Sequence, residues 1–360
     1  MIVVGCDLLD PDTPTGWVSI DVGSAYTCGL SVSGKAWCWG AYHDPYFGPS
    51  FPADSLMDSL TPREIPGGHR FTWVRTGGWG ACGLDAAGTV YCWNIIPSLS
   101  FAGARTARRH PAVALDSARF HSIEMSPSHA CGLAMTETAM CWGSGYRGVI
   151  GNGTAGPMDV AGPTAVEGPT FVQVAVGLLG TCALTFEGAA YCWGARNSGR
   201  VGDGGASSGD ATFPTAVAGN HAFVRIATGQ YHSCGIALDA SMLCWGDNLA
   251  GQLGVGDSLS RSAPAVVSGN LEWREIAIGH AHTCGVTLDW QVYCWGANFA
   301  GQLGTGGFAS SPVPARVPVP GQVTTVSTYN RSTCAINHEQ RAFCWGDESR
   351  LVPMEMPAIR

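Results

Sequence analysis

The sequence contains few charged residues and almost no lysine. Charged side chains make up 13% of the 360 residues, the formal net charge is -8, and Lys35 is the only lysine among 19 basic residues. A surface that binds nucleic-acid phosphates needs clustered positive charge. One short basic cluster is present, which an ordinary solvated loop also explains: Arg105, Arg108, Arg109 and His110. The composition therefore argues against a nucleic acid as partner.

Long apolar runs and catalytic motifs are also missing. No stretch approaches the roughly 20 apolar residues of a membrane-spanning helix. The sequence contains no nucleophile elbow, H-E-x-x-H motif, phosphate-binding loop or dinucleotide fingerprint. Acidic, glycine-rich loops begin at Val201 and Gly254, but they lack the EF-hand spacing, and turn chemistry explains their composition. We expect no catalytic residue, no metal and no cofactor.

Cysteine, in contrast, is abundant and regularly spaced. Seven pairs occur in which the two cysteines are ten positions apart and a tryptophan follows the second, and successive pairs are 49 to 54 residues apart. The pairs are Cys28 with Cys38, Cys82 with Cys92, Cys131 with Cys141, Cys182 with Cys192, Cys234 with Cys244, Cys284 with Cys294, and Cys334 with Cys344. A repeat of this length, with short alternating apolar segments, buries its apolar face only by stacking on its neighbours. Seven repeats of four strands predict an all-β, closed, seven-bladed β-propeller.

The segment from Cys82 to Cys92 shows how each pair is placed. A three-residue loop with Gly88 in the left-handed conformation makes Asp85 and Thr89 the closing pair of a β-hairpin. Counting outward places Cys82 opposite Cys92, in a non-hydrogen-bonded pair with Cα atoms about 4.5 Å apart, close enough for a disulfide. Three of the seven hairpins have this glycine, whereas the others have Glu137, Ala240, Trp290 or Gln340. The sequence leaves the turn geometry of those four open.

Two interpretations of the cysteine pairs remain. They are either small buried side chains that face each other as thiols or seven disulfides, and the common register of all seven favours disulfides. Disulfides require an oxidising compartment, so we expect an extracytoplasmic protein, periplasmic or secreted.

Three segments resemble a known repeat. The runs "YCWGANFAGQLGTGG", "LCWGDNLAGQLGVGD" and "GHAHTCGVTL" are similar to the regulator of chromosome condensation repeat, and the likeness extends from about Trp17 to Pro357. The resemblance implies a seven-bladed propeller, but it implies no single activity, because functions within the family are diverse. The first two repeats depart most: longer, irregular segments follow Trp39 and Trp93.

The N-terminal segment is expected to lie outside the propeller, with residues 1–15 as a signal remnant or linker and 16–360 as a single domain. Val3, Val4 and Gly5 precede Cys6, as in the end of a bacterial lipoprotein signal, although the charged and most of the apolar part of such a signal are absent. Cys6 is therefore either a lipidation site, which would be the only membrane attachment, or an ordinary thiol.

Histidines and tryptophans at repeat positions invite functional interpretations. His232 and His282 occupy the histidine of the family's G-x-x-H-T turn, where the resemblance implies a structural hydrogen bond. His280 is a candidate for the channel or its rim. The seven tryptophans after the cysteines are expected to pack between blades, whereas Trp79 and Trp290 lie in turns and are candidates for exposed contacts.

The function expected is that of a non-enzymatic protein-binding or scaffold module outside the cytoplasm, with an unidentified protein partner. It would be either an accessory subunit held at a membrane complex or a secreted inhibitor or adhesin. Aromatic residues and arginines are enriched at interface hot spots, so the irregular segments supply the candidate contact residues, namely Tyr42, His43, Tyr46, Phe47, Phe51, Phe101, Arg105, Arg108 and Arg109. The alternative from another class is an enzyme that acts on a glycan or peptide at the mouth of the central channel. It would require convergent carboxylates or histidines there.

Overall fold

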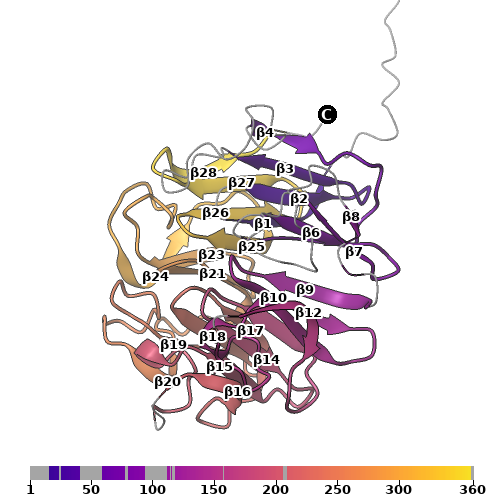
Figure 1. Ribbon diagram of the computed structural model, residues 1–360. Coiled ribbons are helices and arrows are strands. Elements are labelled where there is room, and N and C mark those ends of the chain that lie inside the picture. The colour runs from indigo at the N-terminus through magenta and orange to yellow at the C-terminus, as the bar shows by residue number, and fades with distance from the viewer. Residues whose placement is uncertain are drawn as a thin grey trace, which may run out of the picture.

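Seven four-stranded antiparallel sheets form a ring in the computed structural model of the protein (Figure 1). The structure describes residues 16–23, 26–40, 59–77, 80–93, 112–113, 115, 118–156, 158–205 and 209–357. Each sheet consists of four strands that are consecutive in the chain, and the first strands of successive sheets contact one another around the ring. The prediction of an all-β seven-bladed propeller is confirmed.

The strands are short, because each crosses the propeller once between two turns. Blade 1 contains β1 Trp17–Val22, β2 Thr27–Ser31, β3 Ala36–Gly40 and β4 Ser59–Glu64, and blade 2 contains β5 Trp73–Thr76, β6 Ala81–Leu84, β7 Val90–Trp93 and β8 Ala112–Val113. Blade 3 contains β9 Phe120–Met125, β10 His129–Ala134, β11 Ala139–Ser144 and β12 Asp159–Ala165, and blade 4 contains β13 Gln173–Val176, β14 Gly180–Leu184, β15 Ala190–Gly194 and β16 Ala211–Ala216. Blade 5 contains β17 Phe223–Thr228, β18 His232–Ala237, β19 Met242–Gly246 and β20 Arg261–Val266. Blade 6 contains β21 Trp273–Ile278, β22 His282–Thr287, β23 Val292–Gly296 and β24 Ser311–Val317, and blade 7 contains β25 Val323–Tyr329, β26 Ser332–Asn337, β27 Ala342–Gly346 and β28 Arg350–Glu355. Two short 3-10 turns, η2 Tyr146–Gly148 and η3 Asn197–Gly199, follow the third strands of blades 3 and 4.

The ring closes without exchange of a strand between its ends. The strand β1 pairs with β2, and β28 pairs with β27, so the first and last blades are each built from one end of the chain. Figure 1 shows the indigo and yellow blades side by side. They are joined by the Val22 amide, which donates to Ser327 Oγ at 3.0 Å, and by a shared core that includes Trp17, Ile336 and Met356. Side-chain packing and this hydrogen bond therefore close the ring, and every blade begins with the strand that precedes its cysteine hairpin.

The cysteine hairpins have the register deduced from the sequence. In the second blade, for example, the Asp85 amide donates to the Thr89 carbonyl at 3.2 Å, and the two cysteines lie opposite each other. All seven pairs are joined as disulfides, with Cα–Cα distances of 4.0 to 4.1 Å. The bonds join Cys28 to Cys38, Cys82 to Cys92, Cys131 to Cys141, Cys182 to Cys192, Cys234 to Cys244, Cys284 to Cys294, and Cys334 to Cys344. Each blade therefore contains a covalent bridge between its two middle strands, and the thiol interpretation is not the one observed.

The seven hairpins also share one turn geometry. Where the sequence has glycine, φ is positive, and the four other residues at that position are left-handed as well, with φ between 61° and 67° at Glu137, Ala240, Trp290 and Gln340. Non-glycine residues rarely adopt this conformation because of the clash of Cβ with the backbone. The hairpin is thus imposed by the strands and the disulfide, and the turn residue adapts to it.

A substitution at this turn position should therefore stabilise the fold. Ala240→Gly is expected to raise the free energy of unfolding by about 0.5–1 kcal/mol, because glycine removes the strain of a left-handed alanine at a smaller entropic cost. Urea denaturation measures the change. Ala237→Gly, in the adjacent strand, is the control and should be destabilising. Lower stability of Ala240→Gly would contradict the strain argument.

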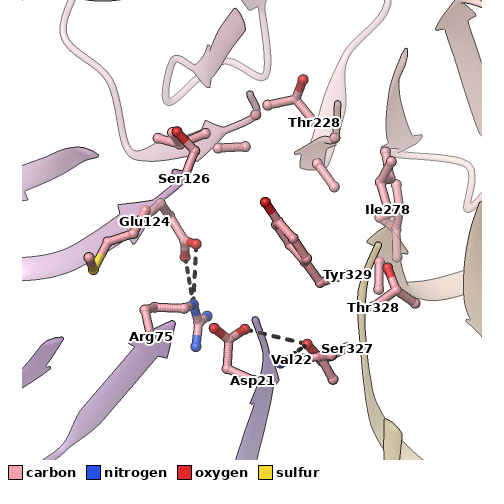
Figure 2. A pocket seen from close by; sticks show the side chains of 18 of the residues that line it. Asp21, Val22, Arg75, Glu124, Ser126, Thr228, Ile278, Ser327, Thr328 and Tyr329 are labelled. Carbon is pink, nitrogen blue, oxygen red and sulfur yellow. Dashed lines mark hydrogen bonds and ion pairs between the residues drawn. The ribbon is translucent and has the colours of Figure 1, made fainter. Parts of the chain in front are cut away.

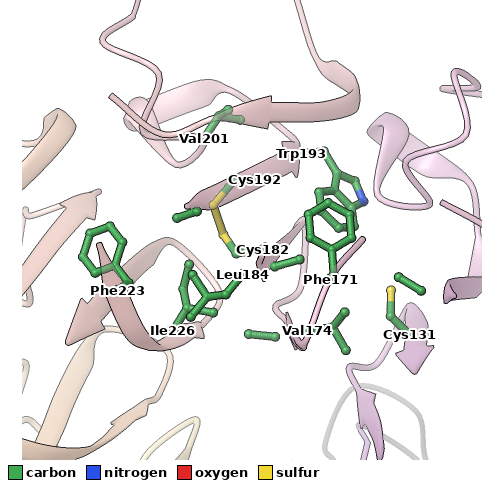
Figure 3. Close-up of a cluster of buried hydrophobic side chains, with 14 of the residues drawn as sticks. Cys131, Phe171, Val174, Cys182, Leu184, Cys192, Trp193, Val201, Phe223 and Ile226 are labelled. Atoms are coloured by element: carbon green, nitrogen blue, oxygen red, sulfur yellow. A yellow bond between two sulfur atoms is a disulfide. The ribbon is translucent and has the colours of Figure 1, made fainter. Parts of the chain in front are cut away.

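The repeat tryptophans pack between neighbouring blades, as expected. Trp193 lies against Phe171, with ring centroids 6.0 Å apart, and both belong to a core that reaches from blade 3 into blade 5 (Figure 3). The Trp193 indole donates to the Val149 carbonyl of blade 3 at 2.8 Å. The indoles of Trp245 and Trp345 make the corresponding bond to the preceding blade. Each such ring therefore joins its blade to the one before it by both packing and a hydrogen bond.

Candidate functional site

The first strands of the seven blades surround a central cavity of about 600 Å³. Successive side chains of a strand point to opposite faces of its sheet. Ile20 and Val74 are buried in the core, so their neighbours in the first strands point into the central cavity. In each blade, one channel-facing residue of the first strand lies opposite the first cysteine. This residue is Asp21, Arg75 or Glu124 in the first three blades and an alanine in the next three. At this level, charge is therefore concentrated on one side of the channel.

Two ion pairs cross between neighbouring blades in this channel. Arg75 Nε lies 3.1 and 3.2 Å from the two carboxylate oxygens of Glu124, and the side chains are 21% and 27% exposed (Figure 2). Arg225 Nη2 lies 3.0 Å from Glu275 Oε1. Burial raises the pKa of both glutamates, and the neighbouring arginine opposes that shift in each. The arginines therefore favour the charged form of both carboxylates in a poorly solvated channel.

The third channel carboxylate, Asp21, is held by neutral donors. Its Oδ2 accepts hydrogen bonds from the Thr76 amide at 2.6 Å and the Thr76 hydroxyl at 2.7 Å, and Ser327 Oγ donates to Oδ1 at 3.4 Å. Asp21 thereby ties blade 1 to blades 2 and 7. All three carboxylates thus have structural partners.

Removal of one partner should show that the Arg75–Glu124 pair is structural. Arg75→Met is expected to lower the free energy of unfolding by about 2–3 kcal/mol, because Glu124 loses its counter-ion in a poorly solvated channel, while the remaining exposure keeps the cost below that of a fully buried pair. The double variant Arg75→Met with Glu124→Met should recover part of the loss, as measured by urea denaturation. Equal stability of wild type and Arg75→Met would contradict this role.

One end of the channel holds a residue that the sequence reasoning missed. After the first strand, six blades place glycine or serine at the start of the turn, but blade 7 has Tyr329. Figure 2 shows its ring pointing into the space near Glu124, Ser126 and Thr228. Burial raises the pKa of the Tyr329 phenol, so it stays protonated. Alignment of the seven turns would have revealed it, since a tyrosine replaces a small residue there.

The buried histidines link blades and do not line a reactive site. His232 Nε2 lies 2.6 Å from Thr283 Oγ1 of the next blade, and that hydroxyl donates to the Gln252 carbonyl at 2.8 Å. His282 and His129 make the same kind of contact with a threonine of the next blade. Because the threonine hydroxyl donates to a carbonyl, the imidazole must donate to it. The structural role expected for His232 and His282 is therefore observed, and His129 has the same role.

The remaining candidate residues are placed as follows. His280 lines the cavity and contacts the ring of Tyr231, with centroids 4.9 Å apart. Trp290 is half-buried, with the Arg274 guanidinium 3.4 Å from its ring centroid. Among the residues that the structure describes, no group of three or more histidines, cysteines or acids could hold a metal ion. In the loop after Gly254, Asp257 accepts from the Leu259 amide at 2.9 Å, which is ordinary turn chemistry.

The predicted contact residues lie outside the described part of the chain. Tyr42, His43, Tyr46, Phe47 and Phe51 belong to the segment between β3 and β4, and the others, which are Phe101, Arg105, Arg108 and Arg109, to the segment between β7 and β8. Cys6 and Trp79 are also outside it. Every blade is an antiparallel sheet of four consecutive strands, so the connections from third to fourth strand all lie on the same side of the propeller. The strands β3 and β7 therefore end on this side. We call this side the loop face. None of the helices within the described ranges has the length and apolar character needed to cross a bilayer.

Comparisons with known proteins agree with this architecture. The "Regulator of chromosome condensation (RCC1) repeat" matches residues 187–236, 239–286 and 291–336, and a second description of the same repeat matches 171–200, 223–252 and 273–302. Human E3 ubiquitin-protein ligase HERC2 is 28% identical over 259 residues, 66% of this chain and 5% of that protein. The Arabidopsis thaliana ultraviolet-B receptor UVR8 is 28% identical over 250 residues, 68% of this chain and 56% of that protein. The chain thus spans little of the first relative and just over half of the second.

Solved structures show the same fold. Prp20p from Saccharomyces cerevisiae superposes with a TM-score of 0.73 at 20% identity, covering 87% of this chain and 80% of that one. Human WBSCR16 gives 0.78 at 18% identity, covering 89% and 87%. The CRINKLY WD40 ectodomain of the Arabidopsis thaliana receptor kinase ACR4 gives 0.56 at 20% identity, covering 92% and 97%. Propellers of this kind are often protein-interaction modules. The RCC1 repeat is thus matched in blades 4 to 7, within residues 171–336, and the chain is a seven-bladed β-propeller that contains RCC1 repeats.

Proposed function

We propose that the protein is a non-enzymatic binding or scaffold module that works outside the cytoplasm and presents a rigid ring face to a protein partner. The observation that supports this most is the set of seven intrablade disulfides, which form and persist in oxidising compartments. A cross-linked surface loses little conformational entropy on association. The receptor-kinase ectodomain of similar fold is one example of such a propeller outside a cell.

The loop face is the side that we propose for the partner. Regular third-to-fourth-strand loops are tied down internally: Asn298 Nδ2 donates to the Gly307 and Ala309 carbonyls at 2.9 and 3.0 Å, and its Oδ1 accepts from the Leu303 amide. The corresponding segments of blades 1 and 2 lack this sequence and are rich in aromatic residues and arginine. Such side chains supply most of the energy at protein interfaces.

Substitution of three residues in these segments tests the proposal. The triple variant Tyr46→Ala, Phe47→Ala and Arg109→Ala should weaken capture of the native partner about tenfold or more, because hot-spot residues each contribute more than about 1 kcal/mol. The partner is identified by affinity purification from the native membrane fraction, and its binding is then titrated with purified components. The melting temperature should not change.

A matched control separates these segments from the rest of the loop face. Leu249 and Phe299 occupy the regular loops of blades 5 and 6 and are 80% and 52% exposed. The double variant Leu249→Ala with Phe299→Ala should leave capture unchanged. Unchanged capture by the triple variant would refute the placement of the contact.

Cys6 distinguishes the two forms of the proposed function. An accessory subunit held at a membrane complex would have a lipid on Cys6 and would lack the residues before it, whereas a secreted inhibitor or adhesin would not be acylated. Intact-mass measurement of the native protein decides between them. Met1 retained beside a free thiol would discard the anchored form.

A further inference from the structure

The face opposite the loop face has a repeated surface pattern of its own. The hairpins between the second and third strands all end on this side, which we call the hairpin face. In blades 3 to 7 the hairpin turn begins four residues after the first cysteine of the blade. An acidic residue lies one or two positions after that residue. All these side chains are exposed, and the pairs are Met135 with Glu137, Phe186 with Glu187, Leu238 with Asp239, Leu288 with Asp289, and His338 with Glu339. The face thus presents an arc of mostly apolar side chains beside acids across five consecutive blades.

The apolar members are too exposed to be part of the core. Phe186 is 87% exposed, Leu238 77% and Leu288 49%. Val172, just before β13, and Val224, near the start of β17, are about half exposed on the same side. A backbone hydrogen bond links the hairpin to the first strand of its blade: the Leu238 amide donates to the Ala222 carbonyl at 2.9 Å. Large exposed apolar side chains that gather on one face beside polar residues are typical of interaction sites.

Turn chemistry accounts for some of the acids but not for the whole set. Asp239 accepts from the Ser241 amide at 3.0 Å, and Asp289 from the Thr287 hydroxyl, as acids in tight turns do. The Glu187 carboxylate makes no ion pair or hydrogen bond with any residue in the described ranges. The Glu187 carboxylate is therefore exposed beside Phe186 and does not stabilise its turn through a hydrogen bond.

The basic residues at the rim of the same sector are already engaged. The Arg274 guanidinium stacks on Trp290, and Arg316 donates from Nε to Gln291 Oε1 at 3.1 Å. In blades 4 to 6 the hairpin face therefore combines three large apolar side chains with a surplus of carboxylates. A partner must bring apolar side chains to cover the first set and positive charge to meet the second.

We propose that the hairpin face of blades 4 to 6 binds a basic, amphipathic polypeptide segment of a partner protein. Lysine or arginine side chains of the segment pair with Glu187, Asp239 and Asp289, and its apolar side chains cover the neighbouring phenylalanine and leucines. This rests on the proposed binding function and extends it with a second surface and a stated partner chemistry, on the side away from the irregular segments.

The test uses a defined probe. A fluorescein-labelled helical peptide of lysine and leucine is titrated with the intact, oxidised protein at two salt concentrations, and fluorescence anisotropy is recorded; the same peptide with glutamate in place of lysine is the charge control. Two triple variants should each weaken binding of the basic peptide about tenfold or more. The charge variant is Glu187→Gln, Asp239→Asn and Asp289→Asn, and the apolar variant is Phe186→Ser, Leu238→Ser and Leu288→Ser. Added salt should weaken wild-type binding and affect the charge variant less.

Matched substitutions on the loop face control for nonspecific binding of the peptide to exposed apolar side chains. The double variant Leu249→Ser with Phe308→Ser, at side chains 80% and 54% exposed, should bind the peptide as wild type does. Equal binding of the glutamate peptide, or unchanged affinity in both hairpin-face variants, would overturn the inference. The two proposals can fail separately. If the hairpin-face variants bind the peptide normally and the triple variant of the irregular segments loses capture of the native partner, the hairpin-face proposal is rejected and the proposed function stands.

Discussion

Reduction of the seven disulfides is expected to unfold the propeller at ambient temperature. Each bond closes a loop with a sequence separation of 10 residues, which contributes about 2–3 kcal/mol by limiting the freedom of the unfolded chain. Even half of the summed effect is comparable with the net stability of about 5–15 kcal/mol that is typical of folded proteins. Far-ultraviolet circular dichroism with and without a reductant, together with thiol titration of unfolded material, measures the loss.

A single bridge can be removed to check the magnitude. The double variant Cys234→Ala with Cys244→Ala should lower the free energy of unfolding by about 2–3 kcal/mol, with an added cost for the lost sulfur contacts, since both cysteines are fully buried. Cys6→Ser, which lies outside the seven pairs, is the control and should have no effect on the melting temperature. If the fully reduced protein melted within a few degrees of the oxidised one, the disulfides would not be what stabilises the ring.

Acidification from pH 6.5 toward pH 4 is expected to destabilise the protein through its inter-blade histidines. Burial lowers the pKa of His129, His232 and His282 from 6.5 to about 3. Below pH 6.5 the unfolded chain therefore binds protons that the folded protein does not, and stability falls as the pH falls. Each histidine contributes about 1.4 kcal/mol of lost stability per pH unit in this window.

The geometry explains why the histidines resist protonation. Nδ1 of His232 and Nδ1 of His282 are buried and have no hydrogen-bond partner in the described part of the chain, so a proton there would lack an acceptor. The channel carboxyls act in the opposite sense: burial raises the pKa of Glu124 and Glu275, so the folded protein takes up those protons first on acidification. Burial raises the pKa of Asp347 as well. The three histidines stay unprotonated in the folded protein across the whole window from pH 6.5 to 4, so we expect a net loss of stability.

Two variants separate titration from hydrogen bonding. His282→Gln removes one titrating group, so the slope of stability against pH between 6.5 and 4 should flatten by about 1.4 kcal/mol per pH unit, whatever its stability at pH 7. Thr333→Val removes the 3.1 Å contact with His282 and keeps the imidazole, so it should lower stability and leave the slope as it was. Urea denaturation at a series of pH values gives both quantities. Identical slopes in wild type and His282→Gln would contradict the assignment.

The repeat pattern predicted the local structure well because local rules govern it. Two-residue alternation and a three-residue turn place Cys82 opposite Cys92 whatever the rest of the chain does, and the structure has this register. The predicted packing of the repeat tryptophans between blades is also confirmed. The left-handed Ala240 and Trp290 were not predictable from propensity, since it disfavours both residues there.

The candidate site was predicted less completely, because its parts meet only in the ring. Arg75 and Glu124 are 49 residues apart in the chain and join across two blades, and nothing in either segment alone indicates the partner. Tyr329 shows how a visible signal can be missed: its significance lies in the small residues at the same position of the other six blades. The hairpin-face acids look like separate turn residues in the sequence, and only the topology places them on one side.

The sequence by itself determined the repeat, the number of blades, the hairpin register and the pairing of cysteines, because each follows from spacing within about ten residues or from its repetition. Only the tertiary structure decided where the blades divide, how β1 and β25 close the ring, which charges meet in the channel and which side chains share a face. Those features depend on contacts between segments far apart in the chain, such as Val22 with Ser327, which are 305 residues apart, and no local pattern encodes such a contact.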